Sequence, residues 1–282
     1  MSDEKSLKYN EPWILQRADP YVYRHTDGSY YFTASVPAYD GIVLRRAGTL
    51  AELSGAEEVM VWKKHESGPM SYHIWAPEIH YLFGKWYIYF AGGEAEDIWK
   101  IRPYVLECSG DDPLTDEWVE LGKMKRAAED EFSFEAFSLD ATVFENKGEY
   151  YYVWAEKVGV GKMISNLYIA KMESGNQLKT VQILLTTPDY DWERKGFWVN
   201  EGPAVIHHDG KLFLTYSASE TGVDYCVGML SIDEDADILD PRLWKKERYP
   251  VLKTCEKLGI YGPGHNLSLI HISEPTRRVV IS

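Results

Sequence analysis

Four acidic residues recur along this chain at nearly constant spacing, each placed just before an alternating run of apolar residues. They are Asp19, Glu78, Asp140 and Glu201, separated by 59, 62 and 61 residues. Like charges gathered in a small hollow destabilise one another, and proteins retain them mainly where the shifted pKa values are used. The pattern therefore favours acid–base chemistry. The alternative is that each acid accepts backbone N–H groups at its strand start, which we favour for Glu78.

The segments after each acid indicate β-hairpins arranged in a repeat. Alternating apolar runs meet at Gly-containing turns, which is typical of a hairpin. A third apolar run follows in each period, and a fourth follows with Trp62, Trp118 or Trp244 in three of them; the run from Val181 is less regular. Four strands in a unit of about 60 residues are the pattern of a β-propeller blade. Because the first strand of a blade is the innermost, we expect the acids to converge on a shared axis.

A fifth period would begin near residue 262, and there His265 in YGPGHN takes the place of an acid. We expect this histidine to donate to a neighbouring carboxylate, with metal binding as the alternative. The following segment, LSLIHISEPTRRVVIS, has neither the turn nor the alternation of the earlier units. The prediction is an all-β, five-bladed propeller with four-stranded blades and an incomplete fifth blade. Residues 1–266 form its catalytic domain, and residues 267–282 form a tail that does not look native.

Composition limits the classes of function. The chain has 282 residues and a formal net charge of −14, which disfavours nucleic acid and membrane surfaces as partners. The start, MSDEKSLKYN, has no apolar core and no run of 18 apolar residues occurs later, so we expect neither a signal peptide nor a membrane span, and a cytoplasmic protein. The three cysteines, Cys108, Cys226 and Cys255, lack metal-site spacing and are predicted to be free thiols.

Five blocks of the sequence resemble the signature segments of glycoside hydrolase family 43. In chain order they are RADPYVYRHTDGSYYFTAS, WAPEIHYLFGKWYIYF, FSLDATVFENKGEYYYVWAEK, VNEGPAVI and YGPGHN. The similarity runs from Arg17 to Asn266. The resemblance implies a five-bladed propeller and an inverting hydrolase that acts on arabinose or xylose units of plant polysaccharides such as arabinan and xylan. It implies no required cofactor.

The resemblance also implies roles for individual residues. Asp19 in the ADP block matches the general base of the family, Asp140 in SLDA matches an orienting acid that modulates pKa, and Glu201 in NEGP matches the general acid. We expect an ionised Asp140 to raise the pKa of Glu201. Arg17, two residues before Asp19, would share its face in an extended segment and offer it a positive charge, although a salt bridge elsewhere is an equal alternative.

Three further residues are candidates for binding. Trp75 in WAPE matches an aromatic residue that lines the sugar pocket of the family, and Trp198 also precedes an acid-bearing strand start. His265 matches an axial histidine that, in many members, lies beside a central calcium or water site. We therefore expect a central calcium, bound through water, as an optional ion.

The amino-acid sequence of these blocks is most similar to that of exo-acting α-L-arabinofuranosidases, so the predicted ligands are oligosaccharides containing arabinose or xylose. β-Xylosidase and endo-arabinanase activities remain alternatives, and so does a non-catalytic sugar-binding propeller. A retaining, fructan-active propeller would need an Asn-Asp-Pro-Asn block, where this chain has Ala18-Asp19-Pro20-Tyr21. After Asn266 the chain departs from the family, so we expect a substrate-binding arginine of the last blade to be missing and do not assign its role to Arg277 or Arg278.

Overall fold

The strands of this protein fall into four consecutive units with the same internal order. The computed structural model describes residues 13–158 and 164–266. Unit 1 contains β1 (Ala18–Arg24), β2 (Tyr30–Ser35), β3 (Gly41–Ala47) and β4 (Val59–Lys63). Unit 2 contains β5 (Tyr72–Leu82), β6 (Lys85–Glu94), β7 (Asp97–Cys108) and β8 (Val119–Lys123). In both units the strands pair in chain order as a four-stranded antiparallel sheet.

Units 3 and 4 follow the same plan but are joined. Unit 3 contains β9 (Ser138–Asn146), β10 (Glu149–Lys157), β11 (Ile164–Ser174), β12 (Gln177–Leu178) and β13 (Ile183–Thr186). Unit 4 contains β14 (Trp198–His208), β15 (Lys211–Ala218), β16 (Cys226–Asp233) and β17 (Lys245–Lys246). A short parallel pairing between β11 and β14 merges them into one nine-stranded sheet. Four 3-10 helices lie between strands: η1 (Ala51–Gly55), η2 (Asp191–Glu193), η3 (Pro241–Leu243) and η4 (Glu256–Leu258).

Tight turns explain why each unit opens with a hairpin. Between the first two strands of units 2, 3 and 4, two consecutive residues have positive φ: Phe83-Gly84, Lys147-Gly148 and Asp209-Gly210. Two left-handed residues form the turn whose twist matches that of the flanking strands, and glycine at the second position lowers its cost. The hairpins predicted from alternation and turn residues are therefore confirmed.

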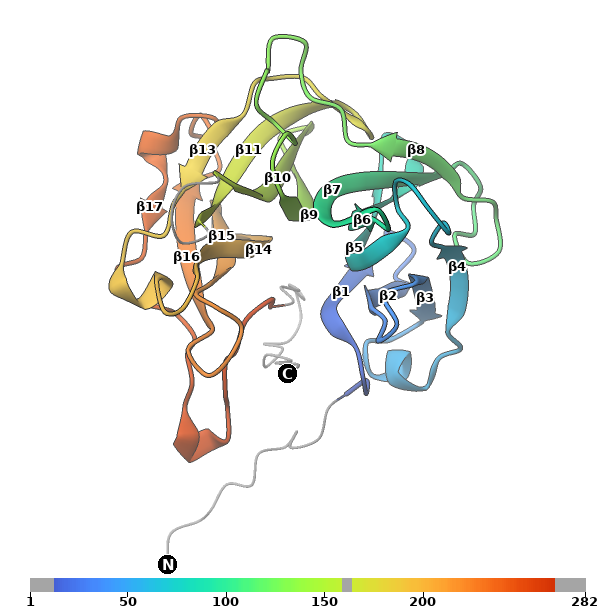
Figure 1. Cartoon of the computed structure of the whole chain (residues 1–282), viewed down its shortest axis with the longest axis horizontal. Helices are drawn as coiled ribbons and strands as arrows, with labels where there is room; N and C mark the ends of the chain where they lie inside the picture. Colours follow the sequence, from blue (N-terminus) through green and yellow to red (C-terminus); the bar gives the residue numbers. More distant parts are fainter. Residues whose placement is uncertain (1–12, 159–163, 267–282) are drawn as a thin grey trace, which may run out of the picture.

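The units are arranged in an arc (Figure 1), with β1–β4 at one end and β14–β17 at the other. Their first strands lie in succession along the inner side, because β1 contacts β5, β5 contacts β9 and β9 contacts β14. The all-β class and the inner position of the first strands are as predicted. Within the described residues the arc does not close and no fifth sheet is formed, so five blades remain a prediction. The predicted tail, 267–282, lies outside the described residues.

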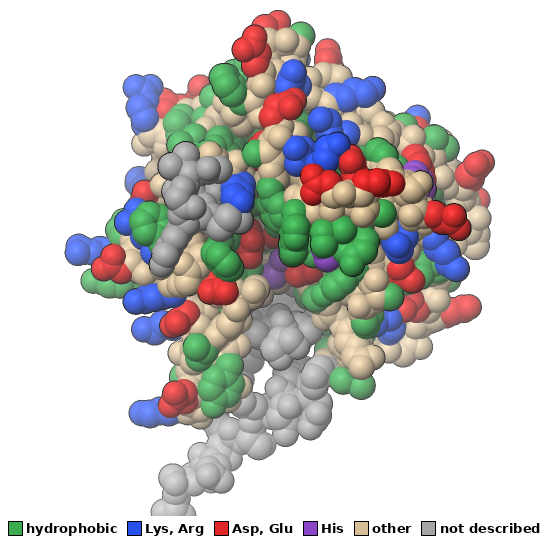
Figure 2. Space-filling view, in the orientation of Figure 1, with side chains coloured by type: hydrophobic (Ala, Val, Ile, Leu, Met, Phe, Trp, Pro, Cys, Tyr) green, Lys and Arg blue, Asp and Glu red, His purple; other side chains and the backbone are tan. Residues whose placement is uncertain are grey.

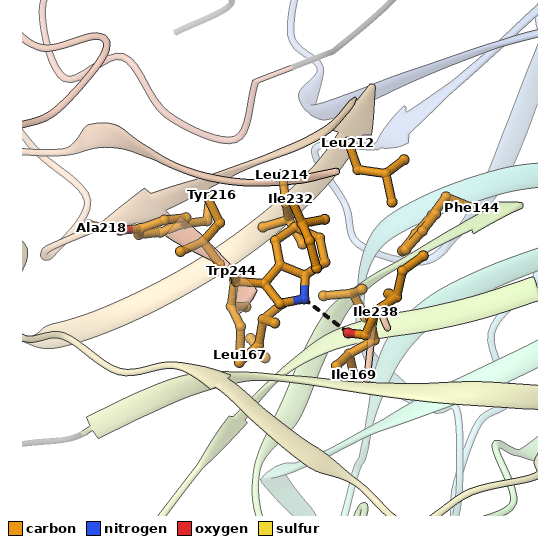
Figure 3. Packing of buried hydrophobic residues seen from close by; sticks show 14 of the residues in the cluster. Phe144, Leu167, Ile169, Leu212, Leu214, Tyr216, Ala218, Ile232, Ile238 and Trp244 are labelled. Atoms are coloured by element: carbon orange, nitrogen blue, oxygen red, sulfur yellow. Dashed lines mark hydrogen bonds between the residues drawn. The ribbon is translucent and has the colours of Figure 1, made fainter. Parts of the chain in front are cut away.

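Apolar side chains pack between consecutive units. One cluster joins units 3 and 4 around Trp244, which contacts residues such as Leu167 and Leu214 and donates a 2.9 Å hydrogen bond from Nε1 to the Ile238 carbonyl (Figure 3). Similar clusters join units 2 and 3 and units 1 and 2. Burial of each large side chain contributes about 1.5–3 kcal/mol, so the packing holds the inner strands in fixed relative positions.

Two other expectations concern the described residues. Cys108, Cys226 and Cys255 are free thiols, as predicted. In the part of the chain that the structure describes, no helix has the length and apolar character needed to cross a membrane.

Candidate active site

Each innermost strand contains a β-bulge near its start, and this bulge determines where the acids point. In β1 the partners change from Ala18↔Ser35 to Tyr21↔Thr33, so that three residues advance on one strand against two on the other. The same shift occurs in β5, β9 and β14. In every bulge the second residue has a left-handed backbone: Asp19 (φ 51°), Ala76 (φ 46°), Asp140 (φ 51°) and Gly202 (φ 53°). Such bulges re-aim side chains and cluster beside active sites.

The bulges show that the four acids are not equivalent positions. Asp19 and Asp140 are the second residues of their bulges, whereas Glu201 is the first residue of its own and Glu78 is the fourth. The even spacing of the acids is therefore not the structural repeat, which runs through residues 19, 76, 140 and 202. As a result Glu201 leaves its strand in a different direction from the two aspartates.

Asp19 is held by a hydroxyl that also binds the next unit. Oγ of Ser35 donates a 2.6 Å hydrogen bond to Oδ2 of Asp19, and the backbone N–H of Ala76 donates to the same Oγ at 2.8 Å. Nδ1 of His265 lies 3.2 Å from Oδ1 of Asp19. The bulge of unit 2 thus helps to orient the carboxylate of unit 1, and a histidine faces its other oxygen.

Asp140 is the most enclosed acid of the group, with 7% of its side chain exposed. The backbone N–H of Gly202 donates to its Oδ2 at 3.1 Å, and Nδ1 of His265 lies 3.7 Å from the same oxygen. Burial raises the pKa of Asp140 well above its usual range, and the charges of Glu201 and Asp19 raise it further, while His265 and the Gly202 N–H act against the rise. A left-handed glycine suits this close approach, because a Cβ on Gly202 would lie 3.3 Å from Nδ1 of His265.

Glu201 receives a 2.7 Å hydrogen bond from the hydroxyl of Tyr225. Burial raises the pKa of Glu201 and the charge of Asp19 adds to the rise, whereas the Tyr225 hydroxyl and His265 oppose it. Glu201 and Asp140 repel each other when both are ionised, and the charge of Glu201 is among the causes that raise the pKa of Asp140. The effect of an ionised Asp140 on the pKa of Glu201 stays a prediction.

His265 connects these groups. Its backbone N–H donates a 2.5 Å hydrogen bond to Oγ of Ser217, and its ring nitrogen faces Asp19 and Asp140. Burial alone would lower the pKa of His265, but the surrounding carboxylates outweigh it and raise the pKa above its usual value. The expected donation to a carboxylate fits this geometry. Across residues 13–158 and 164–266, no group of three or more His, Cys, Asp or Glu side chains could hold a metal, so these side chains do not fit a directly bound calcium.

Glu78 pairs with a histidine of its own strand. Its Oε2 is 2.9 Å from Nε2 of His80, and Nδ1 of His80 lies 3.4 Å from the Tyr21 hydroxyl. Its pairing with a histidine differs from the backbone capping that we favoured. Glu78 also helps to line a pocket. The walls of this pocket come from the bulges, from the residues that follow them, and from the segment around His265: Pro20, Tyr21, Glu78, Thr142, Val143, Gly202, Pro203, Ala204, Val205, His265 and Asn266.

The remaining candidates have separate surroundings. Trp75 directly precedes the Ala76 bulge and its ring lies 4.3 Å from that of His73. The guanidinium carbon of Arg194 lies 4.7 Å from the ring centre of Trp198. Arg17 forms an ion pair with Glu58, so the alternative to an Arg17–Asp19 pair holds. Figure 2 shows acidic and histidine side chains in the middle of one face, in the place that the strands of Figure 1 surround, with hydrophobic side chains beside them.

Three polar residues of this site were not predicted from the sequence: Ser35, Ser217 and Tyr225. Ser35 and Ser217 occupy equivalent positions, because they pair with Ala18 and Glu201, the first residues of their bulges. The segments YYFTAS and LFLTYSAS each place a serine at this point of the second strand, which is the signal that could have revealed them. Together the contacts bring Asp19 and a histidine with a raised pKa close to two carboxyls whose pKa values are also raised. This arrangement is suited to general acid–base catalysis.

Comparison with known proteins identifies relatives over most of the chain. The family model described as Glycosyl hydrolases family 43 matches residues 9–276. A protein of Streptomyces avermitilis named "Extracellular exo-alpha-(1->5)-L-arabinofuranosidase" is 49% identical over 261 residues, which cover 93% of this chain and 53% of that protein. A Streptomyces chartreusis protein of the same name is 48% identical and covers 92% of this chain and 77% of its own length.

A solved structure, the α-L-arabinofuranosidase from Lactobacillus brevis, is also similar. It matches with a TM-score of 0.85 and 49% identity, covering 94% of this chain and 82% of that one. The chain therefore spans about half the length of the Streptomyces avermitilis relative but most of the Lactobacillus brevis structure.

The names of the relatives correct one prediction. We expected a cytoplasmic protein because the first residues lack a signal peptide. Both Streptomyces relatives are named extracellular enzymes, so the cytoplasmic prediction is wrong. Its premise, the composition of the first ten residues, carries no information about the mature location.

Proposed function

The chain belongs to glycosyl hydrolases family 43, and from this premise we propose that it is an inverting α-L-arabinofuranosidase. It releases terminal α-L-arabinofuranosyl units from arabinan- or arabinoxylan-derived oligosaccharides. The family has a β-propeller fold, and residues 1–266 are its catalytic domain with four blades and the beginning of a fifth. β-Xylosidase and endo-arabinanase activities are the alternatives that a substrate panel distinguishes.

Asp19 acts as general base in this proposal. Inversion requires a carboxylate that activates water on one face of the sugar and a carboxylic acid that protonates the leaving oxygen on the other. The Ser35 hydroxyl donates to Oδ2 of Asp19, and Nδ1 of His265 lies 3.2 Å from Oδ1. Both carboxylate oxygens of the proposed base are therefore held in place.

Glu201 acts as general acid, and Asp140 orients the group. The pKa of Glu201 is raised first by burial, as a proton donor near neutral pH requires. Asp140 accepts the N–H of Gly202, the residue after Glu201, and therefore holds the backbone of the proposed acid. Trp75 and Trp198 are proposed to line the sugar pocket, because each lies within three residues of a bulge. A central calcium bound through water is an optional addition near His265, and no step depends on it.

One observation carries the proposal: Nδ1 of His265 faces both Asp19 and Asp140, at 3.2 and 3.7 Å. These aspartates are 121 residues apart in the sequence and come from equivalent bulges of different units. A histidine between two acids, with the third acid adjoining through Gly202, supports one shared site.

The test is hydrolysis of 4-nitrophenyl α-L-arabinofuranoside, the matching β-D-xyloside, and linear and branched arabino-oligosaccharides. On the arabino-oligosaccharides, whose leaving sugar hydroxyl must be protonated, Glu201→Gln should lower kcat by about 10²–10⁴-fold, the usual contribution of a general acid, while sugar binding persists. The loss should be smaller on the 4-nitrophenyl glycosides, because 4-nitrophenolate leaves without protonation. Glu247→Gln, which changes an exposed glutamate, is the matched control. NMR of the first-formed sugar should show the inverted anomer. Equal turnover by Glu201→Gln and wild type would contradict the proposal, and binding without turnover by wild type would favour a sugar-binding propeller.

A further inference from the structure

A buried glutamate near the end of β10, Glu156, binds the segment of chain that leads into β9. We call residues 134–137 the entry segment. Glu156 is 4% exposed. The backbone N–H of Phe134 donates to its Oε2 at 3.0 Å, and the backbone N–H of Ala136 donates to its Oε1 at 3.0 Å. Each oxygen of this carboxylate therefore holds one backbone group of the entry segment.

The entry segment continues directly into the strand that carries Asp140. Ser138 is the first residue of β9 and pairs with Glu156 in the sheet. Its Oγ donates to the Ala136 carbonyl at 2.8 Å, which closes the turn between the entry segment and the strand. Asp140 lies two residues after Ser138. The contacts of Glu156 thus fix the backbone immediately before the proposed orienting acid.

The backbone on both sides of Ser138 is strained, so it needs this support. Phe134 and Asp140 have left-handed conformations, with φ of 64° and 51°. Non-glycine residues keep such conformations only where their surroundings fix them by several contacts. The Phe134 ring lies 5.0 Å from the ring centre of Trp154, and Nε1 of Trp154 donates to Oε2 of Glu156 at 2.8 Å. Packing and hydrogen bonds therefore hold the entry segment together.

A carboxyl in this position is costly to bury and must be offset by its donors. Burial raises the pKa of Glu156, while the hydrogen bonds from Trp154, Phe134 and Ala136 act against the rise. Two of these donors are backbone groups of the entry segment. The ionised carboxylate is thus stabilised only while the entry segment is in place.

We propose that Glu156 is a positioning residue for Asp140. It acts through the backbone of the entry segment and Ser138, and it sets the direction in which the Asp140 carboxyl meets the Gly202 N–H and His265. The inference rests on the proposed function, in which Asp140 orients the catalytic group. Glu156 contributes no proton to the reaction in this account.

Glu156→Leu removes both acceptor oxygens and tests the proposal. On α-1,5-arabinotriose it should lower kcat by about 10–100-fold, because a misplaced catalytic group costs rate, while KM changes much less. Glu156→Gln keeps one acceptor oxygen and should recover part of kcat. An unchanged kcat in Glu156→Leu would overturn the proposal.

Asp130→Asn is the matched control, because Asp130 is also a buried carboxylate of the same loop. It is 3% exposed and accepts the backbone N–H groups of Phe132 and Ser133, at 2.8 and 3.0 Å. These residues precede the entry segment. Asp130→Asn should therefore lower stability but leave kcat nearly unchanged. Equal losses of kcat in Asp130→Asn and Glu156→Leu would show a general effect of the loop and overturn the proposal.

A double-mutant cycle distinguishes positioning from a merely structural role. Residues that act as a unit have non-additive effects on rate. Glu156→Leu should consequently lower kcat much less in the Asp140→Asn background than in wild type, because the carboxyl that it positions is already gone. A loss of the same factor in both backgrounds would refute the proposal.

Thermal unfolding separates this inference from the proposed function. Asp140→Asn replaces a buried carboxyl by an amide and should raise Tm at pH 7. The rise should be smaller in the Glu156→Leu background, where Asp140 is free to move toward water. That difference supports the inference even if wild type hydrolyses no arabinoside, in which case only the proposed activity fails. Equal changes in Tm would refute the inference even if wild type is active. If Glu156→Leu does not fold, Glu156→Gln takes its place in both cycles.

Discussion

The hydroxyl of Tyr225 donates a 2.7 Å hydrogen bond to Oε1 of Glu201. Tyr225 immediately precedes β16, so a residue at the start of the third strand of unit 4 holds the proposed acid on the first strand. The phenol is buried, and its own pKa lies well above the ordinary value, with burial as the main cause and Glu201 contributing. It therefore acts as a fixed donor that stabilises the carboxylate form of Glu201 and limits the rise in pKa that burial causes.

Tyr225→Phe should consequently raise the pKa of Glu201 further. A hydrogen bond to a charged group contributes about 1.5–3 kcal/mol, so the shift should be about one to two pH units. If Glu201 must be protonated to donate, the basic limb of the kcat/KM profile moves to higher pH. The pH profile of arabinofuranoside hydrolysis measures this, with Tyr249→Phe as control. A basic limb that stays in place or moves to lower pH would show that Tyr225 does not control the proposed acid.

Asp140→Asn should stabilise the protein while lowering its activity. The folded pKa of Asp140 is raised, mainly by burial, above the unfolded value of about 3.9. Between these two values the folded state binds more protons than the unfolded state, so the carboxyl costs stability as pH rises through the folded pKa. We expect a gain of about 1–2 kcal/mol at pH 7.

The pH dependence provides the check on Asp140→Asn. Urea unfolding of both proteins at several pH values should give a difference that is small near about pH 3, below the unfolded and folded pKa values of the aspartate, and larger toward neutral pH. A difference that does not change with pH would mean that the folded pKa is not raised. Asp237→Asn, in a surface turn, is a control for the substitution itself.

Ser35→Ala removes a hydroxyl with two partners. It should cost about 1–3 kcal/mol of stability, because the buried N–H of Ala76 loses its acceptor. It should also lower kcat, because Asp19 loses the donor that orients it. Thermal unfolding and kinetics measure the two effects, and Ser54→Ala, at an exposed serine, is the control. Ser35→Cys and Ser35→Thr should recover stability only to the extent that the new sulfur or hydroxyl oxygen accepts a hydrogen bond from the Ala76 N–H. Unchanged stability in Ser35→Ala would contradict the contact.

The hairpins and the convergence of their first strands could be predicted from the sequence, because alternation and turn residues are local signals. The register could not. A bulge inserts one residue without ending the apolar run, so Glu78 looked equivalent to Asp19 although Ala76 holds that position. Asp140 was placed in the correct register because it is, like Asp19, the left-handed residue of its bulge.

The partners of the acids were harder to predict than the acids. Tyr225 belongs to a region read as a third strand, and its contact with Glu201 depends on how two strands of one unit are placed. Ser35 links two units by accepting a hydrogen bond from the backbone N–H of Ala76. The amino-acid type at position 76 gives no sign of this contact. His265 was predicted to face a carboxylate, and two carboxylates face it, because its backbone is fixed to Ser217.

A buried glutamate outside the proposed catalytic group anchors the start of β14. Glu193 is 0% exposed and accepts hydrogen bonds from Lys246 Nζ at 2.9 Å, the Tyr216 hydroxyl at 2.9 Å and Asn200 Nδ2 at 3.0 Å. Asn200 directly precedes Glu201, so the hydrogen bond from Asn200 to the buried Glu193 carboxylate helps to fix the backbone of the proposed acid. The geometry makes Glu193 a positioning residue.

Glu193→Gln should therefore destabilise the protein by about 3–5 kcal/mol, because Lys246 would keep its charge in a mostly buried position without its main partner. Asp189 is the matched control: it contacts the same Lys246 at 3.3 Å with 56% of its side chain exposed, so Asp189→Asn should cost less than about 1 kcal/mol. Urea unfolding measures both variants. At temperatures where Glu193→Gln remains folded, kcat should fall more than KM rises, since Asn200, which precedes Glu201, would donate to a neutral amide oxygen in place of a carboxylate. Equal destabilisation by the two variants would contradict this account, because it would mean that burial does not distinguish the two ion pairs.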